Sequence, residues 1–223
     1  MEELTVTTKA LPVSLLIDKE ASEEQFSDFI NDLTHEHVIA KIVRRPPEGP
    51  FAALDWLIPT GIILFIAKPY FETILEKMAE DHYAFLKSAT GKLWKKFFGP
   101  KPEIERFVFG LGRVIKTSPF SRAFSITAHS SDETKITLIF LNETTPEDFV
   151  ISIEKFEYLM LQHHSKKGTD PLSLMLESRE LPPKDWQQLI YLNPISKKLH
   201  LIDYVKSSQL NELISDEIPD SNL

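Results

Sequence analysis

The chain has 223 residues, of which 42% are hydrophobic and 26% are charged, the composition of an ordinary globular protein. It contains no cysteine, which excludes disulfides, thiol nucleophiles and cysteine-ligated metal centres. Its formal net charge of -8 argues against a uniformly basic surface, so we expect no nucleic acid among its partners.

The N-terminal part alternates strand and helix patterns. Val13–Ile17 has the composition of a strand, and Val38–Val43 predicts a second one. Between them, Ser22 and Gln25 have the spacing of a capping box, which predicts a helix that begins there and ends near His35. Short connections join the three elements, so we expect a strand–helix–strand unit.

The most distinctive segment runs from residue 51 to residue 98. Its apolar run Ile62–Ala67 has the length of a strand that is buried on both faces. Pro69 then occupies the first turn of a predicted long helix, whose apolar residues recur at steps of three and four as far as Phe98. This apolar stripe is too wide to stay in water, so we expect it to help form the core.

Beyond the Gly99–Pro102 break the pattern becomes rich in strands. A second helix is expected to begin at Pro146, capped by Thr145, and to stop at Gly168. The expected strands and hairpin arms are Arg106–Phe109, Ala123–Ala128, Lys135–Leu141, Leu189–Leu192 and Leu199–Val205, with a short helix over Leu172–Ser178.

Together these patterns predict an α+β protein. A strand–helix–strand unit and one long helix are followed by a mostly antiparallel sheet with a second packed helix. We expect an N-terminal part over residues 1–98, a C-terminal part over residues 104–205, and a loosely held acidic tail over residues 206–223.

No catalytic, metal-binding or nucleotide-binding motif stands out, and we expect no cofactor and no metal. His35 and His37 lack an identifiable third ligand. The candidates for an enzyme site are scattered: Asp55 in an apolar segment, His82 on the apolar stripe of the long helix, and His129. A structural ion pair for Asp55 and a hydrogen-bonded core histidine for His82 are the simpler explanations.

A candidate interaction patch lies at the end of the long helix. It consists of Lys92, Trp94, Lys95, Lys96, Phe97 and Phe98. Aromatic residues interleaved with lysines mark some helices that lie on membrane surfaces. Lysines also favour the C-terminal end of any helix, in which case the aromatic residues pack inward.

We therefore expect a non-enzymatic interaction or scaffold subunit of a larger assembly, with another protein chain as its partner. One alternative is a protein of the membrane surface acting through residues 51–98. The other is an enzyme with a site around Asp55 and His82. The sequence given opens without a basic region followed by an apolar core, so we expect no signal peptide and a cytoplasmic location.

Overall fold

The structure of the protein is a computed structural model. It describes residues 11–18, 22–34, 38–45, 62–71, 92, 94–98, 119–130, 134–166, 168–179, 187–210 and 212–220. Several predictions lie outside these residues: the middle of the long helix, the Gly99–Pro102 break, the strand at Arg106–Phe109, and the segments that hold His35, His37, Asp55 and His82.

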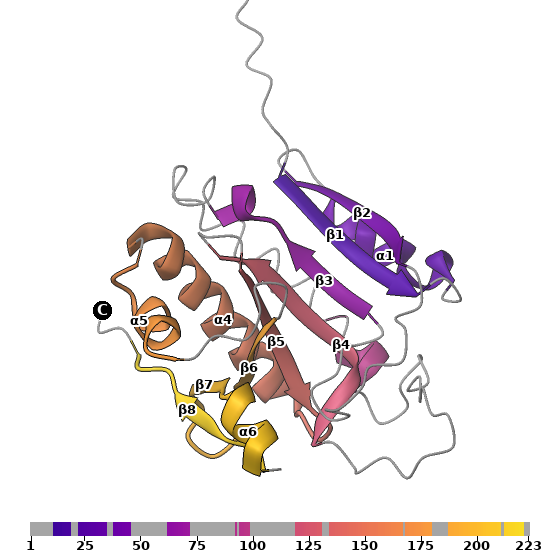
Figure 1. Cartoon of the computed structure of the whole chain (residues 1–223). Coiled ribbons are helices and arrows are strands. Elements are labelled where there is room, and N and C mark those ends of the chain that lie inside the picture. Colours follow the sequence, from indigo (N-terminus) through magenta and orange to yellow (C-terminus); the bar gives the residue numbers. More distant parts are fainter. Residues whose placement is uncertain are drawn as a thin grey trace, which may run out of the picture.

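The described residues form a mixed sheet with the strand order β2-β1-β3-β4-β5-β6-β7-β8 (Figure 1). The pairs β1–β2, β3–β4 and β5–β6 are parallel, and the other neighbours are antiparallel. The strands are β1 (Leu11–Asp18), β2 (Val38–Arg45), β3 (Ile62–Ile66), β4 (Phe120–His129), β5 (Lys135–Leu141), β6 (Gln188–Leu192), β7 (Leu199–Ile202) and β8 (Ser215–Glu217).

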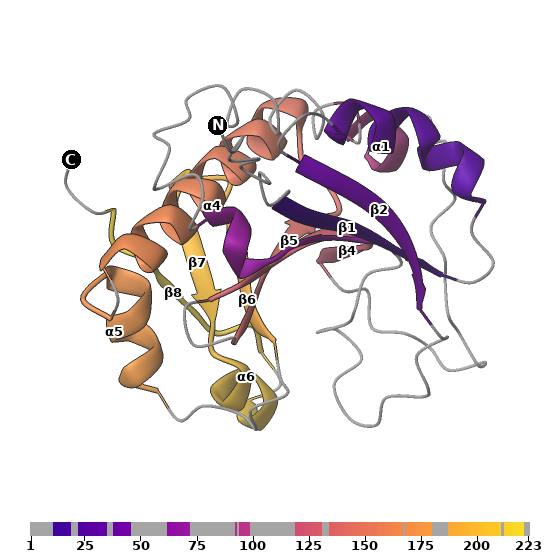
Figure 2. The same ribbon diagram turned by 90° about the horizontal axis from the view of Figure 1, so that it is seen from above.

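Helices cover both sides of this sheet. On one side lie α1 (Ser27–Leu33), which follows the 3₁₀ turn η1 (Glu23–Phe26), and α4 (Pro146–Lys166) (Figure 2). Next to α4 packs α5 (Pro171–Glu177), whereas α6 (Tyr204–Leu210) lies on the opposite side. Residues 68–71 and 94–97 are also helical. Helices packed on a mixed sheet confirm the α+β class.

The main core lies between the sheet and the helices α1 and α4. Phenylalanine rings form its centre: Phe124 of β4 stacks on Phe97 at 5.0 Å between centroids and on Phe140 of β5 at 5.8 Å. Phe149 of α4 lies 4.8 Å from Phe140. A smaller apolar cluster on the other side contains Ile139 and Tyr191. The aromatic cluster thus connects segments from both halves of the chain.

Local sequence signals explain most element boundaries. Thr145 Oγ1 accepts a hydrogen bond of 3.1 Å from the backbone N–H of Asp148, which confirms the predicted start of α4. The helix ends at Lys166, and Gly168 has a φ of 97°, a value that favours glycine. The apolar run at β3 is a central strand, as predicted, with Leu64 fully buried.

Two expectations were wrong. Ser22 precedes η1, but its side chain makes no capping hydrogen bond, because a 3₁₀ turn replaces the first turn of the predicted α-helix. The expected loose tail contains most of α6 and all of β8 instead. Strand β8 completes the sheet by pairing with β7, and Ile218 after it is buried.

The pairing of β3 with β4 also bears on the expected division of the chain. Ile62 lies opposite Phe124 in a parallel ladder, so the strands on either side of residues 99–103 belong to one sheet. The described parts of 1–98 and 104–205 therefore share both a sheet and a core.

Candidate functional site

Of the three scattered candidates for an enzyme site, only His129 lies among the described residues. It is half-buried at the end of β4, and its ring packs edge-on against Phe65 at 4.7 Å. Its backbone carbonyl accepts a hydrogen bond of 2.9 Å from His164 Nε2. The hydrogen bond joins α4 to the sheet, and the ring contact joins β4 to β3. Both histidines therefore contribute to the packing of the fold.

The aromatic members of the candidate interaction patch pack inward. Phe97 is buried, and half-buried Trp94 donates its indole N–H to the carbonyl of Thr144 at 3.2 Å. Lys92 forms an ion pair with Asp32. What faces solvent at this helix end is therefore its lysines. Among the described residues, no helix has both the length and the apolar character needed to cross a membrane.

A serine, a histidine and an aspartate meet in the buried cluster of His163, Asp170 and Ser173. His163 Nδ1 lies 3.2 Å from both carboxylate oxygens of Asp170 and 3.1 Å from Ser173 Oγ. Ser173 donates its hydroxyl to Asp170 Oδ2 at 2.5 Å and its backbone N–H to Oδ1 at 3.0 Å. The serine therefore donates its proton to the aspartate, whereas a catalytic nucleophile would donate it to the histidine.

This cluster is a helix cap. Asp170 is the N-cap of α5 and has no exposed surface. Burial alone would raise the pKa of Asp170, but the Ser173 hydrogen bonds and the nearby His163 outweigh it and hold that pKa below its usual value. Asp170 thus caps α5 and fixes the end of α4 through His163.

Replacing Asp170 with alanine is expected to lower the free energy of unfolding by about 2–3 kcal/mol, because α5 loses its cap and His163 loses its buried partner. Asp170→Asn keeps the capping oxygen and should cost less. Urea unfolding of both variants measures the difference. A loss below about 0.5 kcal/mol for Asp170→Ala would contradict a structural role for the cluster.

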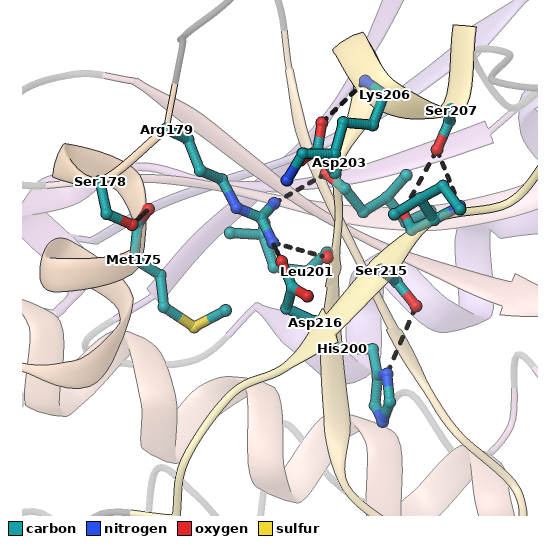
Figure 3. A network of polar contacts seen from close by, with 12 residues as sticks. Met175, Ser178, Arg179, His200, Leu201, Asp203, Lys206, Ser207, Ser215 and Asp216 are labelled. Carbon is teal, nitrogen blue, oxygen red and sulfur yellow. Dashed lines mark hydrogen bonds and ion pairs between the residues drawn. The ribbon is translucent and has the colours of Figure 1, made fainter. Parts of the chain in front are cut away.

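A second polar network fastens the C-terminal strands (Figure 3). Arg179 follows α5 and donates hydrogen bonds to the carbonyls of Ile202 at 3.1 Å and Leu201 at 3.3 Å. Its guanidinium also forms an ion pair with Asp216 of β8. One arginine therefore joins the end of α5 to both β7 and β8.

Asp203 completes this network at the start of α6. It accepts a hydrogen bond from the Lys206 backbone N–H at 2.9 Å and forms an ion pair with the Lys206 side chain at 3.0 Å. Burial alone would raise the pKa of Asp203. The bonds from Lys206, with the charges of Lys206 and Arg179, hold that pKa below its usual value. Every charge in the network has a partner, which is the pattern of a structural brace.

The most unusual buried group is the carboxyl of Glu157 on α4, which is only 3% exposed. Neither of its oxygens has a hydrogen-bond partner with good geometry among the described residues. Burial raises the pKa of Glu157 to about 8, and the nearby Tyr70 hydroxyl lowers it only in part. Burial and the Glu157 charge in turn raise the pKa of Tyr70. At neutral pH this carboxyl is mostly protonated.

A pocket of about 410 Å³ lies where β5 and β6 end and α4 begins. In sheets with parallel strands, ligands commonly bind at the carboxyl ends of the strands, next to the helix that follows. The lining residues are Pro119, Ile139, Phe140, Leu141, Asn142, Glu143, Thr144, Thr145, Asp148, Ser152, Leu192 and Pro194. The lining combines apolar side chains with a polar set from the start of α4.

Asp148 is the acid of this pocket whose contacts are best defined. Its Oδ1 lies 2.5 Å from Lys197 Nζ, and its Oδ2 accepts a hydrogen bond of 2.9 Å from Thr145 Oγ1. The buried Ser152 hydroxyl donates to the Asp148 backbone carbonyl, also at 2.5 Å. In the sequence Asp148 is an acid in the first turn of a helix, a position where acids are common in any protein. Its distant partner Lys197 left no local signal.

No family model, no curated protein and no solved structure matches this chain. Among the described residues there is also no group of three or more histidine, aspartate or glutamate side chains suited to a metal ion.

Proposed function

We propose that the protein is a non-enzymatic interaction subunit that binds an extended segment of a partner chain along the outer edge of β2, where no other described strand pairs with it. The partner segment adds a strand to the sheet. The main-chain ladder supplies affinity, and alternate side chains supply specificity. With no cysteine in the chain, a reducing compartment suits the protein, and we propose the cytoplasm.

The observation that carries this proposal is the length and exposure of the β2 edge. Strand β2 has eight residues and pairs only with β1 among the described residues. Ile39 is 56% exposed, and Lys41 beside it is also exposed. An edge strand presents a row of backbone N–H and C=O groups to any chain that can pair with it.

The opposite edge of the sheet is protected. Strand β8 has three residues, and its acids are held by ion pairs from Asp216 to Arg179 and from Glu217 to Lys198. Short, charged edge strands are a common defence against pairing with other chains. The contrast between the two edges favours β2 as the side that accepts a partner.

The side chains of β2 indicate the chemistry of the partner. Ile39, Lys41 and Val43 alternate onto the side of the sheet away from α1, whereas Ala40 on the other side is buried. A partner strand that places an apolar residue beside Ile39 and an acidic residue beside Lys41 satisfies both. We therefore propose an acidic, alternating segment of another protein as the occupant.

The test uses the pure protein and synthetic eight-residue peptides that alternate acidic and apolar residues, with scrambled and lysine-for-acid versions as controls. Hydrogen exchange should slow at the β2 amides that point away from β1 when the alternating acidic peptide binds, since those amides gain hydrogen bonds. Ile39→Asp combined with Lys41→Glu should weaken binding at least tenfold, because both substitutions oppose an acidic, apolar strand.

Leu174→Asp is the matched control, since Leu174 is 55% exposed and lies on α5, away from β2. This variant should bind like the native protein. The proposal is overturned if the alternating peptide does not bind, if the double variant binds it equally well, or if protection appears away from β2. A lysine-rich peptide that binds as tightly would overturn the acidic chemistry of the partner.

A further inference from the structure

The pocket at the start of α4 lies at a different place in the fold from the proposed β2 interface. It is formed by strands at the centre and C-terminal part of the sheet, whereas β2 is the far edge. A volume of about 410 Å³ falls in the range of small-molecule sites. Its apolar wall includes Leu141, Leu192 and Pro119, so it suits a ligand with a hydrophobic body.

The polar groups of the pocket decide the charge of its ligand. A helix N-terminus alone favours an anion, but Asp148 already places a carboxylate in the first turn of α4. Glu143 adds a second acid to the lining, and Ser152 Oγ has lone pairs left after donating its proton to a carbonyl. These three side chains offer acceptors to the pocket, and a ligand that donates hydrogen bonds fits them.

Lys197 already pairs with the Asp148 carboxylate that such a ligand would contact. Its ammonium reaches Asp148 from the β6–β7 hairpin, and its side chain is 45% exposed. The Lys197 backbone has a φ of 55°, in the left-handed region that residues with a side chain adopt uncommonly. Glycine or asparagine fits this turn position more easily.

We propose that this pocket binds a small primary amine with an apolar body. The ligand's ammonium displaces that of Lys197 at the Asp148 carboxylate, and its apolar part packs on the wall formed by Leu141 and Leu192. Lys197 then acts as an internal competitor that covers Asp148 while the pocket is empty. Because its side chain is half-exposed, the lysine can move into water when the ligand arrives.

The experiment titrates the full chain with n-hexylamine at pH 7 and follows the backbone amide NMR signals of residues 142–152. Hexan-1-ol and hexanoate, of the same chain length, are titrated in parallel. The amine is expected to shift these signals at lower concentration than the alcohol, and hexanoate is expected to leave them unchanged. Asp148→Asn should abolish the preference for the amine over the alcohol, because it removes the carboxylate charge.

Lys197→Met removes the competing ammonium and keeps the aliphatic stem. It is expected to tighten amine binding about fivefold, the gain from losing a half-exposed ion pair. Lys198→Met, one residue along and paired with Glu217, is the matched control and should leave amine binding unchanged.

The proposal is overturned if the alcohol or hexanoate binds as well as the amine, if Lys197→Met leaves the amine affinity unchanged, or if none of the three shifts the signals of residues 142–152. The side chains of Lys197 and Lys198 are exposed to a similar extent, 45% and 38%, so the comparison of their variants does not depend on how Asp148→Asn folds.

Discussion

Glu157→Gln is expected to stabilise the protein by about 3–5 kcal/mol at pH 8 and to change its stability little at pH 5. The native carboxyl is buried without a good hydrogen-bond partner among the described residues, and its pKa is raised to about 8. Each pKa unit between the folded and unfolded states corresponds to about 1.4 kcal/mol. Glutamine has nearly the same shape, but its side chain is neutral at every pH of the experiment, so its burial does not become more costly as the pH rises.

The direction of the pH dependence follows from proton binding. Below about pH 4.5 the carboxyl is protonated in both states and has no effect on stability. Between about pH 4.5 and pH 8 the unfolded chain has released the proton while the folded chain retains it, so stability falls as the pH rises. Above pH 8 the loss is complete and stays constant.

Urea unfolding at pH 5, 6, 7 and 8 measures this effect. The advantage of Glu157→Gln over the native protein should grow steadily across the series. Glu177→Gln, at an exposed residue of α5, is the control and should follow the native profile. A Glu157→Gln profile parallel to that of the native protein would show that the buried carboxyl does not control this pH dependence.

Phe124→Ala is expected to lower the free energy of unfolding by about 3–5 kcal/mol, the usual cost of truncating a buried phenylalanine. Phe124 has no exposed surface and lies within 6.3 Å, between ring centroids, of Phe97, Phe140 and Phe149. These rings come from β5, α4 and the helical residues 94–97, so the cavity would loosen contacts between distant parts of the chain.

Phe65→Ala on the neighbouring strand is the matched comparison. Phe65 is half-buried and faces the opposite side of the sheet from Leu64, so its truncation should cost clearly less than that of Phe124. Denaturant unfolding of the two variants under the same conditions gives both values. Equal losses would mean that the aromatic cluster is not the centre of the core.

The elements that could be predicted from the sequence are those with strong local signals. The threonine cap at Thr145, the proline at Pro146 and the glycine at Gly168 bound α4 as expected. The apolar run of β3 is a central buried strand. Its apolar side chains favour burial, and its buried backbone N–H and C=O groups then need hydrogen-bond partners on strands at both edges. In these cases short-range chemistry and the final fold agree.

Elements decided by distant partners were missed. The residues of β8, Ser215–Glu217, have no strand pattern, and they become a strand because β7 supplies a ladder and Arg179 holds Asp216. Likewise, serine is a common capping residue, but the Ser22 side chain makes no capping hydrogen bond at the start of η1. The sequence next to Ser215–Glu217 and to Ser22 therefore predicts neither the strand nor the missing cap.

The sites were harder to predict than the fold. The pocket brings together residues from before β4, from the start of α4 and from the β6–β7 hairpin. Because these segments are far apart in the chain, no local sequence motif predicts the pocket. Glu157 did leave a signal. It lies four residues after Ile153 and three before Met160, both buried, which places a carboxyl on the apolar stripe of α4. An acid at such a position is a sequence-level indication of a perturbed pKa.

The pairing of β3 with β4 has a consequence for how the chain folds. Ile62 and Phe124 meet across 62 positions of sequence (124 − 62), whereas β6 and β7 meet across a short hairpin. Closing a long loop costs conformational entropy before the contacts at its ends stabilise the fold. Folds that depend on distant pairings therefore form slowly. The β5–β6 ladder also joins distant residues, with Ile136 opposite Gln188, so we expect the β4–β5 and β6–β7 hairpins to assemble first. The β3–β4 ladder, which joins the N-terminal strands to the rest, should form in the slow step.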